Sequence, residues 1–213
     1  MPGYKGPLFR TVFIDRKLPK SAKSTEIRFW GKIFSDLSLA PSYGEGSHGN
    51  MSFRFHKGCI ITATRTDLKN LDEGDFVEIV DCVKEKNEMI VYCKGKREPS
   101  TDSFIHFLIY QERPDIQCIL HGHDDLVLEK AAALKISQTE SEKESGSLEL
   151  FREIKRALGR RNYLIVKNHG ILSFGRTVRE AGDRALRVHE RAMRKPLPPS
   201  DPKTPLDKKT RRK

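Results

Sequence analysis

Two histidines separated by one glycine follow the apolar run 118–120, and no other feature constrains this chain as strongly. If residues 118–123 form a strand, side chains alternate between its faces, so His121 and His123 point the same way. A strand can present two imidazoles to one metal ion in this manner. His169 also follows an apolar run. Three neutral imidazoles that leave a fourth position open are typical of catalytic zinc sites.

A structural role is the alternative for these histidines. Histidines at strand ends can simply bond to backbone carbonyls, because most buried polar groups are hydrogen-bonded. For a lone histidine that is the simpler interpretation. A same-face pair with a third histidine in a matching context leaves both interpretations open.

Basic residues are concentrated at the two ends of the chain. The formal net charge is +11, with 40 Lys/Arg and 29 Asp/Glu in 213 residues, and the stretches 1–24 and 194–213 carry the excess. A nucleic-acid-binding surface needs clustered basic residues on a folded body, whereas 25–193 is balanced in charge. Charge therefore argues against a nucleic-acid-binding protein and leaves weak polyanion binding by the tail, through Lys208, Lys209, Arg211, Arg212 and Lys213.

Apolar runs and cysteine spacing indicate the compartment of the protein and the redox state of its cysteines. No apolar run approaches the ~20 residues of a membrane span, and no signal peptide is evident. The four cysteines lack C-x-x-C spacing and lie in apolar, strand-like runs. This favours reduced, buried thiols in a cytoplasmic protein, while spacing alone leaves a disulfide open.

Apolar periodicity predicts one α/β domain with a mainly antiparallel sheet and helices packed on it. We expect a basic N-terminal arm at 1–23, the domain at 24–194, and a basic, Pro-rich, disordered tail at 195–213. Predicted strands are 49–55, 59–64, 75–81, 89–93, 118–123, 163–167 and 170–174; predicted helices start near 24, 99, 124, 148 and 177. The polar stretch 137–146 is expected to be mobile.

Five motifs follow one another in an informative order. They are Gly49-Asn50-x-Ser52-x-Arg54, Ile61-Thr62-Ala63-Thr64, Pro99-Ser100-Thr101-Asp102-x-x-x-His106-x-x-x-Tyr110, His121-Gly122-His123 and Asn168-His169-Gly170. Over about 25–193 this order resembles the class II aldolase/adducin family, which includes fuculose-phosphate aldolase, ribulose-phosphate 4-epimerase and methylthioribulose-phosphate dehydratase. The resemblance implies a three-layer α/β/α domain and a homotetramer with sites between subunits.

The resemblance also implies a metal site. His121, His123 and His169 would hold one Zn²⁺ per subunit, or another divalent metal ion. Asp102 would complete the coordination or act as the catalytic base, and a helix-capping role is its structural alternative. His106 matches a family position with a structural role, and His48, His56 and His189 have no assigned role.

Neutral donors would bind the substrate phosphate. The family positions map onto Gly49, Asn50, Thr64, Ser100 and Thr101, and hydroxyls with backbone N–H groups at a helix start can hold an anion without a lysine. The aldolases have glycine after Thr64, where this chain has Arg65.

The implied function is a zinc-dependent lyase that acts on a small phosphorylated sugar or hydroxy-carbonyl compound through an enediolate, with aldol cleavage favoured. Epimerisation and dehydration are alternatives within the family, and a non-catalytic adducin-like scaffold is the alternative from another class. The family aldolases use tyrosines for proton delivery after the His-x-His pair. The only tyrosine after Tyr110 in this chain is Tyr163, whose strand position predicts a core residue.

Overall fold

An eight-stranded sheet forms the centre of the computed structural model, which describes residues 8–86 and 88–196. The strand order is β1-β7-β6-β5-β4-β8-β10-β9. The strands are β1 (Phe9–Asp15), β4 (Gly49–Phe55), β5 (Gly58–Thr62), β6 (Phe76–Glu85), β7 (Glu88–Lys94), β8 (Cys118–Gly122), β9 (Tyr163–Val166) and β10 (Gly170–Gly175). β1 runs parallel to β7, and the other neighbouring pairs are antiparallel.

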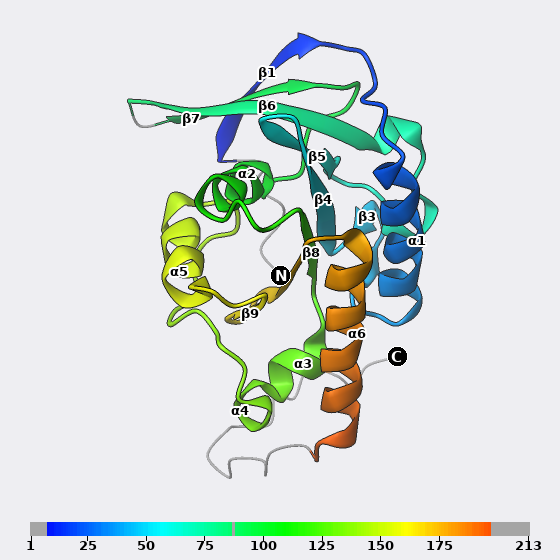
Figure 1. Ribbon diagram of the computed structural model, residues 1–213, viewed down its shortest axis with the longest axis vertical. Helices are drawn as coiled ribbons and strands as arrows, with labels where there is room; N and C mark the ends of the chain where they lie inside the picture. The colour runs from blue at the N-terminus through cyan, green and yellow to red at the C-terminus, as the bar shows by residue number, and fades with distance from the viewer. Residues whose placement is uncertain (1–7, 87, 197–213) are drawn as a thin grey trace, which may run out of the picture.

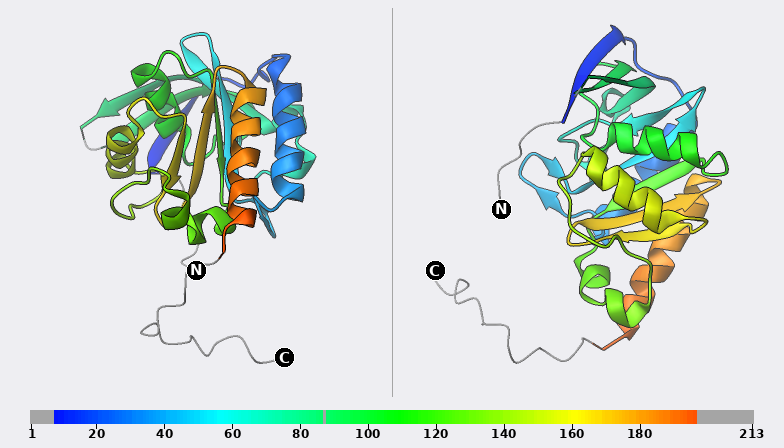
Figure 2. Two further views of the ribbon diagram at one scale, coloured as in Figure 1. Left: turned by 60° about the horizontal axis from the view of Figure 1, so that its bottom comes forward. Right: turned by 90° about the vertical axis from the view of Figure 1, so that its left-hand side faces the viewer.

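Helices cover both faces of the sheet (Figure 1). α1 (Lys23–Asp36) and α6 (Val178–Arg194) lie on one face, while α2 (Ser103–Glu112) and α5 (Leu148–Leu158) lie on the other, as Figure 2 also shows. The short elements are α3 (Asp125–Glu129), α4 (Ala131–Leu134), two 3₁₀ turns (Leu68–Asn70 and Glu73–Asp75) and the small hairpin of β2 (Ser42–Tyr43) and β3 (Gly46–Ser47). The predicted three-layer, mainly antiparallel single domain is confirmed.

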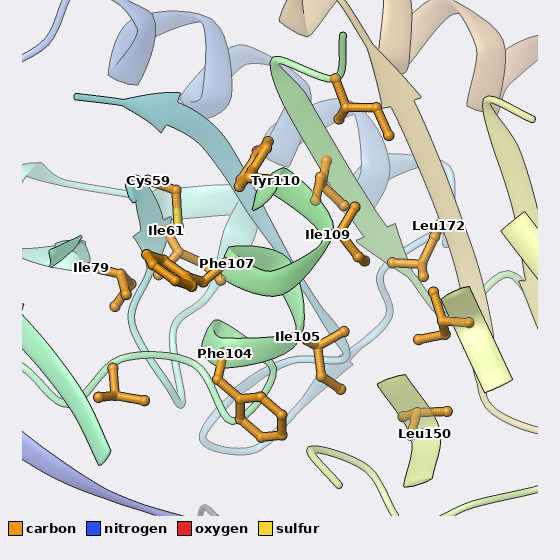
Figure 3. Close-up of a cluster of buried hydrophobic side chains, with 14 of the residues drawn as sticks. Cys59, Ile61, Ile79, Phe104, Ile105, Phe107, Ile109, Tyr110, Leu150 and Leu172 are labelled. Carbon is orange, nitrogen blue, oxygen red and sulfur yellow. The ribbon is translucent and has the colours of Figure 1, made fainter. Parts of the chain in front are cut away.

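The two faces of the sheet build two hydrophobic clusters. Because side chains alternate along a strand, β5 sends Cys59 and Ile61 toward α2 and Ile60 toward α1 and α6. Figure 3 shows the α2 side, where Phe104 and Phe107 of the helix lie in the same cluster as the strand residues. Fully burying a large apolar side chain contributes about 1.5–3 kcal/mol, so packing on both faces stabilises the sheet.

Two stretches, the predicted N-terminal arm, where at most a short strand is expected, and the polar stretch 137–146, are tied to the sheet. The predicted N-terminal arm contains β1, an edge strand paired with β7. The expectation that 137–146 is mobile is wrong for its first residues, because the backbone of Ser137 and Thr139 bonds to both sides of Ile165 in β9. Residues 1–7 of the arm and 197–213 of the tail lie outside the described residues.

None of the described helices combines the length and the apolar character that crossing a bilayer requires.

Candidate metal and substrate site

Three neighbouring strands bring the histidines together. His121 lies on β8, His123 follows the end of that strand, and His169 lies in the turn between β9 and β10. β10 pairs with both β8 and β9, so the turn and the end of β8 meet at one end of the sheet. One nitrogen from each of the three rings lies within 4.8 Å of the others. This spacing fits a single divalent ion held by three imidazoles.

Small residues allow this close approach of the rings. The ring centroids of His121 and His169 are 5.0 Å apart and nearly parallel, and the His123 ring lies 4.6 Å from that of His169. A Cβ added to Gly170 would lie 2.8 Å from Cε1 of His121 and 3.1 Å from Cδ2 of His123. A side chain at position 170 would therefore force the imidazoles apart.

Neighbouring groups prepare the imidazoles for a metal. Nδ1 of His121 is 2.9 Å from the carbonyl oxygen of Ile171. Because a carbonyl only accepts, Nδ1 carries the proton and Nε2 keeps its lone pair for a metal. Burial lowers the pKa of His169 to about 4, and burial, followed by the charge of His121, also holds the pKa of His123 below its usual range. These two rings are neutral at pH 7, as ligands must be.

Asp102 lies beside the histidines with both carboxylate oxygens engaged. Oδ2 accepts a hydrogen bond from Nδ2 of Asn50 at 2.8 Å, and Oδ1 accepts one from Oγ of Ser145 at 3.3 Å. Oδ2 is also 3.9 Å from Nε2 of His121. Asp102 occupies the N-cap position of α2, yet its side chain makes no capping bond. The carboxylate thus faces the histidines instead of capping the helix.

The surroundings keep this carboxyl ionised. Burial opposes its charge, but the nearby rings of His121, His169 and His106 and the amide of Asn50 outweigh burial and hold the pKa of Asp102 below its usual value. A charged acceptor with fixed orientation suits proton transfer or metal ligation.

A buried polar chain supports the site from behind. Nδ1 of His106 lies 2.8 Å from Oγ of Ser52, which in turn lies 2.8 Å from the hydroxyl of Tyr110. Burial lowers the pKa of His106 to about 3. His106 therefore contributes to the core beneath Asp102 as a neutral ring.

Acid should destabilise the metal-free protein through these histidines. In the folded state the pKa values of His106 and His169 lie below 6.5, the value of an unperturbed histidine, so the unfolded chain binds protons first as the pH falls. Their stabilising contribution is complete above about pH 6.5 and declines toward pH 4, by up to ~1.4 kcal/mol per pH unit for each histidine. Urea unfolding of chelator-treated protein at pH 7 and pH 5 measures the loss. An unchanged midpoint would contradict the neutral, buried state.

The residues predicted for phosphate binding lie on β4, just after β5 and just before α2. Gly49 has φ +135°, and a Cβ there would lie 2.5 Å from the carbonyl oxygen of His121. Asn50 is the partner of Asp102, and Oγ of Ser100 accepts from the backbone N–H of Asp102 at 3.3 Å. The backbone of Thr64 bonds to Glu98, and Thr101 forms part of the turn before α2. β4 and the start of α2 therefore bring Asn50 and Ser100 to Asp102, while Thr64 is tied to the segment before α2 through Glu98.

Arg65 replaces the family glycine while keeping a left-handed backbone, with φ +52°. Its guanidinium forms an exposed ion pair with Glu45, with Nε 3.4 Å from Oε2. Glycine adopts such a conformation without steric cost, so Arg65 occupies a turn shaped for glycine.

Several residues near the histidines escape the sequence analysis. The ring of His48 stacks on that of His123 at 5.1 Å, and Tyr43 lies 4.6 Å from His48. Only the position of His48 directly before the Gly49-Asn50 motif could have indicated it. No sequence pattern indicated a role for Ser145 in the site. Away from this cluster, Nδ1 of His189 bonds Asp124 at 2.8 Å, and Tyr163 is buried, as predicted.

The four cysteines are free thiols. Burial raises the pKa of Cys93 and of Cys118 to about 12. A thiol with so high a pKa is protonated at neutral pH. Cys59, Cys93 and Cys118 are buried, as predicted, and Cys82 is half-buried.

Fold and site together define a class of protein: a three-layer α/β/α domain with three convergent histidines and a buried carboxylate at one end of its sheet. Residues 33–194 match the family described as Class II Aldolase and Adducin N-terminal domain. The chain belongs to this family, as its motifs predict.

Known relatives and solved structures agree with this membership. An L-fuculose phosphate aldolase of Methanococcus maripaludis is 30% identical over 153 residues, which are 65% of this chain and 79% of the relative. A 5-methylthioribulose-1-phosphate/5-deoxyribulose-1-phosphate aldolase of Rhodospirillum rubrum is 26% identical over 166 residues, 70% of each chain. A sugar-phosphate aldolase structure from Thermotoga maritima, 20% identical, has a TM-score of 0.62 and covers 79% of this chain and 90% of its own. This last likeness establishes the fold.

Proposed function

We propose that this protein is a zinc-dependent aldolase that cleaves a carbon–carbon bond in a small phosphorylated sugar or related hydroxy-carbonyl compound. The observation that carries the proposal is the convergence of three imidazole nitrogens within 4.8 Å, with the Asp102 carboxylate 3.9 Å from His121. Two relatives, an L-fuculose phosphate aldolase and a 5-methylthioribulose-1-phosphate/5-deoxyribulose-1-phosphate aldolase, support the substrate class. By family analogy we also infer a homotetramer in the cytoplasm.

His121, His123 and His169 would hold the metal ion. As neutral ligands they leave its full charge available, and the ion supplies Lewis acidity that polarises a substrate carbonyl and stabilises negative charge on the substrate oxygens. The hydrogen bond from Nδ1 of His121 to Ile171 keeps that ring oriented.

Asp102 would transfer a proton. In aldol cleavage a hydroxyl loses its proton as the carbon–carbon bond breaks, so that one fragment leaves as an aldehyde. The electron pair of the broken bond remains on the ketone fragment, which later takes up a proton. An ionised carboxylate beside the histidines can accept the first proton and return one afterwards. Asn50 and Ser145 hold the carboxylate in place for both steps.

The phosphate would bind at the edge formed by Gly49, Asn50, Thr64, Ser100 and Thr101. Hydroxyls and backbone N–H groups near the start of α2 are suitable neutral donors for an anion. The bonds of the Thr64 backbone with Glu98 and of the Asn50 side chain with Asp102 support a shared location, because Glu98 and Asp102 lie on either side of Ser100 and Thr101 in the chain.

Ser145→Ala is expected to lower kcat about 2- to 10-fold, in line with the ~0.5–1.5 kcal/mol of a typical hydrogen bond, while metal content stays the same. The substitution removes one of the bonds that orient Asp102. Ser141→Ala, in the same stretch, is the matched control and should retain the wild-type kcat. Steady-state kinetics decide between the two results. An unaltered kcat in Ser145→Ala would show that this bond does not position the carboxylate.

Dehydration is the second candidate reaction, since a methylthioribulose-1-phosphate dehydratase of Sodalis glossinidius is 29% identical over 85 residues. Both reactions begin with charge developing next to a carbonyl, so the same metal and the same carboxylate serve either one. Product analysis separates them, because cleavage yields two fragments and dehydration yields one compound and water.

Metal analysis followed by a substrate screen tests the proposal. We expect about one zinc per chain, and release of an aldehyde from L-fuculose 1-phosphate or from a 5-substituted ribulose 1-phosphate. A chelator should abolish the release and added zinc should restore it. Bound zinc without turnover of any sugar phosphate would favour the adducin-like scaffold. Protein that binds no metal would overturn the proposal.

A further inference from the structure

The small hairpin of β2 and β3 brings His48 to the metal-binding histidines. His48 follows β3, and its backbone N–H donates to the carbonyl oxygen of Pro41 at 2.9 Å, which closes the base of the hairpin. The next residue, Gly49, runs against the backbone of His121. The hairpin and β4 therefore anchor His48 from both sides.

An aromatic row leads from the histidines toward solvent. The rings of His123 and His48 are stacked, with centroids 5.1 Å apart and planes at 24°, and the Tyr43 ring follows at 4.6 Å from His48. Exposure rises along the site: His121 is buried, His123 and His48 are half-buried, and Tyr43 is 37% exposed. His48 thus lies between His123 and the exposed end of the row.

The polar atoms of His48 are available to a ligand. Within 8–86 and 88–196, no residue forms a hydrogen bond with its ring nitrogens, although its ring stacks on that of His123 and lies against the tilted ring of Tyr43. Other polar groups that the mechanism leaves unused are turned elsewhere: His106 bonds Ser52, and His189 bonds Asp124. A rigid ring with free donor and acceptor atoms can bind a ligand at little cost in conformational entropy.

We propose that His48, supported by Tyr43, is a substrate-binding residue that hydrogen-bonds a hydroxyl or carbonyl oxygen of the phosphorylated substrate next to the metal. The inference rests on the proposed function and adds a specificity-determining contact on the exposed side of the site. An imidazole offers one donor and one acceptor, which matches the hydroxyl-bearing carbons of a sugar chain. For substrates that lack the oxygen bound by His48, this residue should add nothing to the binding affinity.

The test compares two histidines that flank β4. His48→Asn removes the proposed contact, and His56→Asn is the matched control, because His56 is exposed at the opposite end of the strand. His56 has φ +51°, a conformation that asparagine tolerates. Each protein is loaded with zinc, its metal content is measured, and its affinity for dihydroxyacetone phosphate is determined by calorimetry.

We expect His48→Asn to keep one zinc per chain and to raise the Kd for dihydroxyacetone phosphate at least tenfold. His56→Asn should match the wild type in both measurements. Tyr43→Phe should raise the Kd less, since the ring that supports His48 remains. Should His48→Asn not fold, as judged by circular dichroism, His48→Gln and Tyr43→Phe provide the same comparison.

Three results would overturn the inference, and they differ from a failure of the proposed function. Wild-type affinity in His48→Asn would exclude the contact. Loss of zinc in His48→Asn would assign His48 to metal retention instead. If the wild type binds zinc but not dihydroxyacetone phosphate, the metal site is supported and the proposed substrate contact is refuted. A wild type that binds no zinc would overturn both the proposed function and the inference.

Discussion

Replacing both His121 and His123 with alanine is expected to remove the bound metal completely and, with it, all measurable cleavage of a sugar phosphate. Only His169 would remain of the three convergent imidazoles, and one imidazole does not retain a divalent ion against dilution or dialysis. Elemental analysis of the dialysed variant measures the metal, and the assay used for the wild type measures the activity.

His189→Ala serves as the control for this double substitution. It also removes an imidazole, but one that bonds Asp124 outside the three-histidine cluster. Circular dichroism should show that both variants keep the secondary structure of the wild type. One equivalent of metal in the double variant would refute the site, because the ion would then be held by other residues.

The second large effect is expected for Asp102→Asn. The amide keeps the size of the side chain but removes its charge and its capacity to accept a proton, so kcat should fall about 10²- to 10⁴-fold. Asn50 would also lose the charge-assisted bond that it makes with Oδ2. Steady-state kinetics of the zinc-loaded variant measure the effect.

Metal content of Asp102→Asn separates the two roles that the sequence leaves open. Retention of zinc with a low kcat identifies a proton-transfer group, whereas loss of zinc identifies a ligand. Asp124→Asn is the matched control, since it alters another buried carboxylate that instead bonds His189 and the start of α3. Wild-type kcat in Asp102→Asn would remove this residue from the mechanism.

Short sequence patterns predict the parts of the site that lie within one strand. Strand alternation predicts that His121 and His123 share a face, and the apolar runs before them and before His169 predict the strands that carry them. The order of motifs then indicates the family, from which the three-layer fold follows. Each of these inferences uses residues that are close in the sequence or a pattern shared across a family.

Contacts made by residues distant in the sequence are harder to predict. Ser145 lies in a Ser/Glu/Lys-rich stretch whose composition indicates mobility, yet its hydroxyl reaches Asp102, 43 positions away. His48 lies in a glycine-rich loop, and its stacking on His123 depends on how β4 pairs with β8. The pairing of β1 with β7 likewise has no local signal. Such contacts follow from tertiary packing, which neither composition nor periodicity describes.

β10 is hydrogen-bonded to β8 on one side and to β9 on the other. The register of these two strand pairs therefore determines the distance between the His-x-His pair and the third imidazole. A one-residue slip in either ladder would carry His169 away from its partners while leaving every histidine in the chain. Buried apolar residues such as Leu172 and Phe174 therefore help to fix the spacing of the three imidazoles without belonging to the cluster, and inactive variants should be sought in the core of β10 as well as among the histidines.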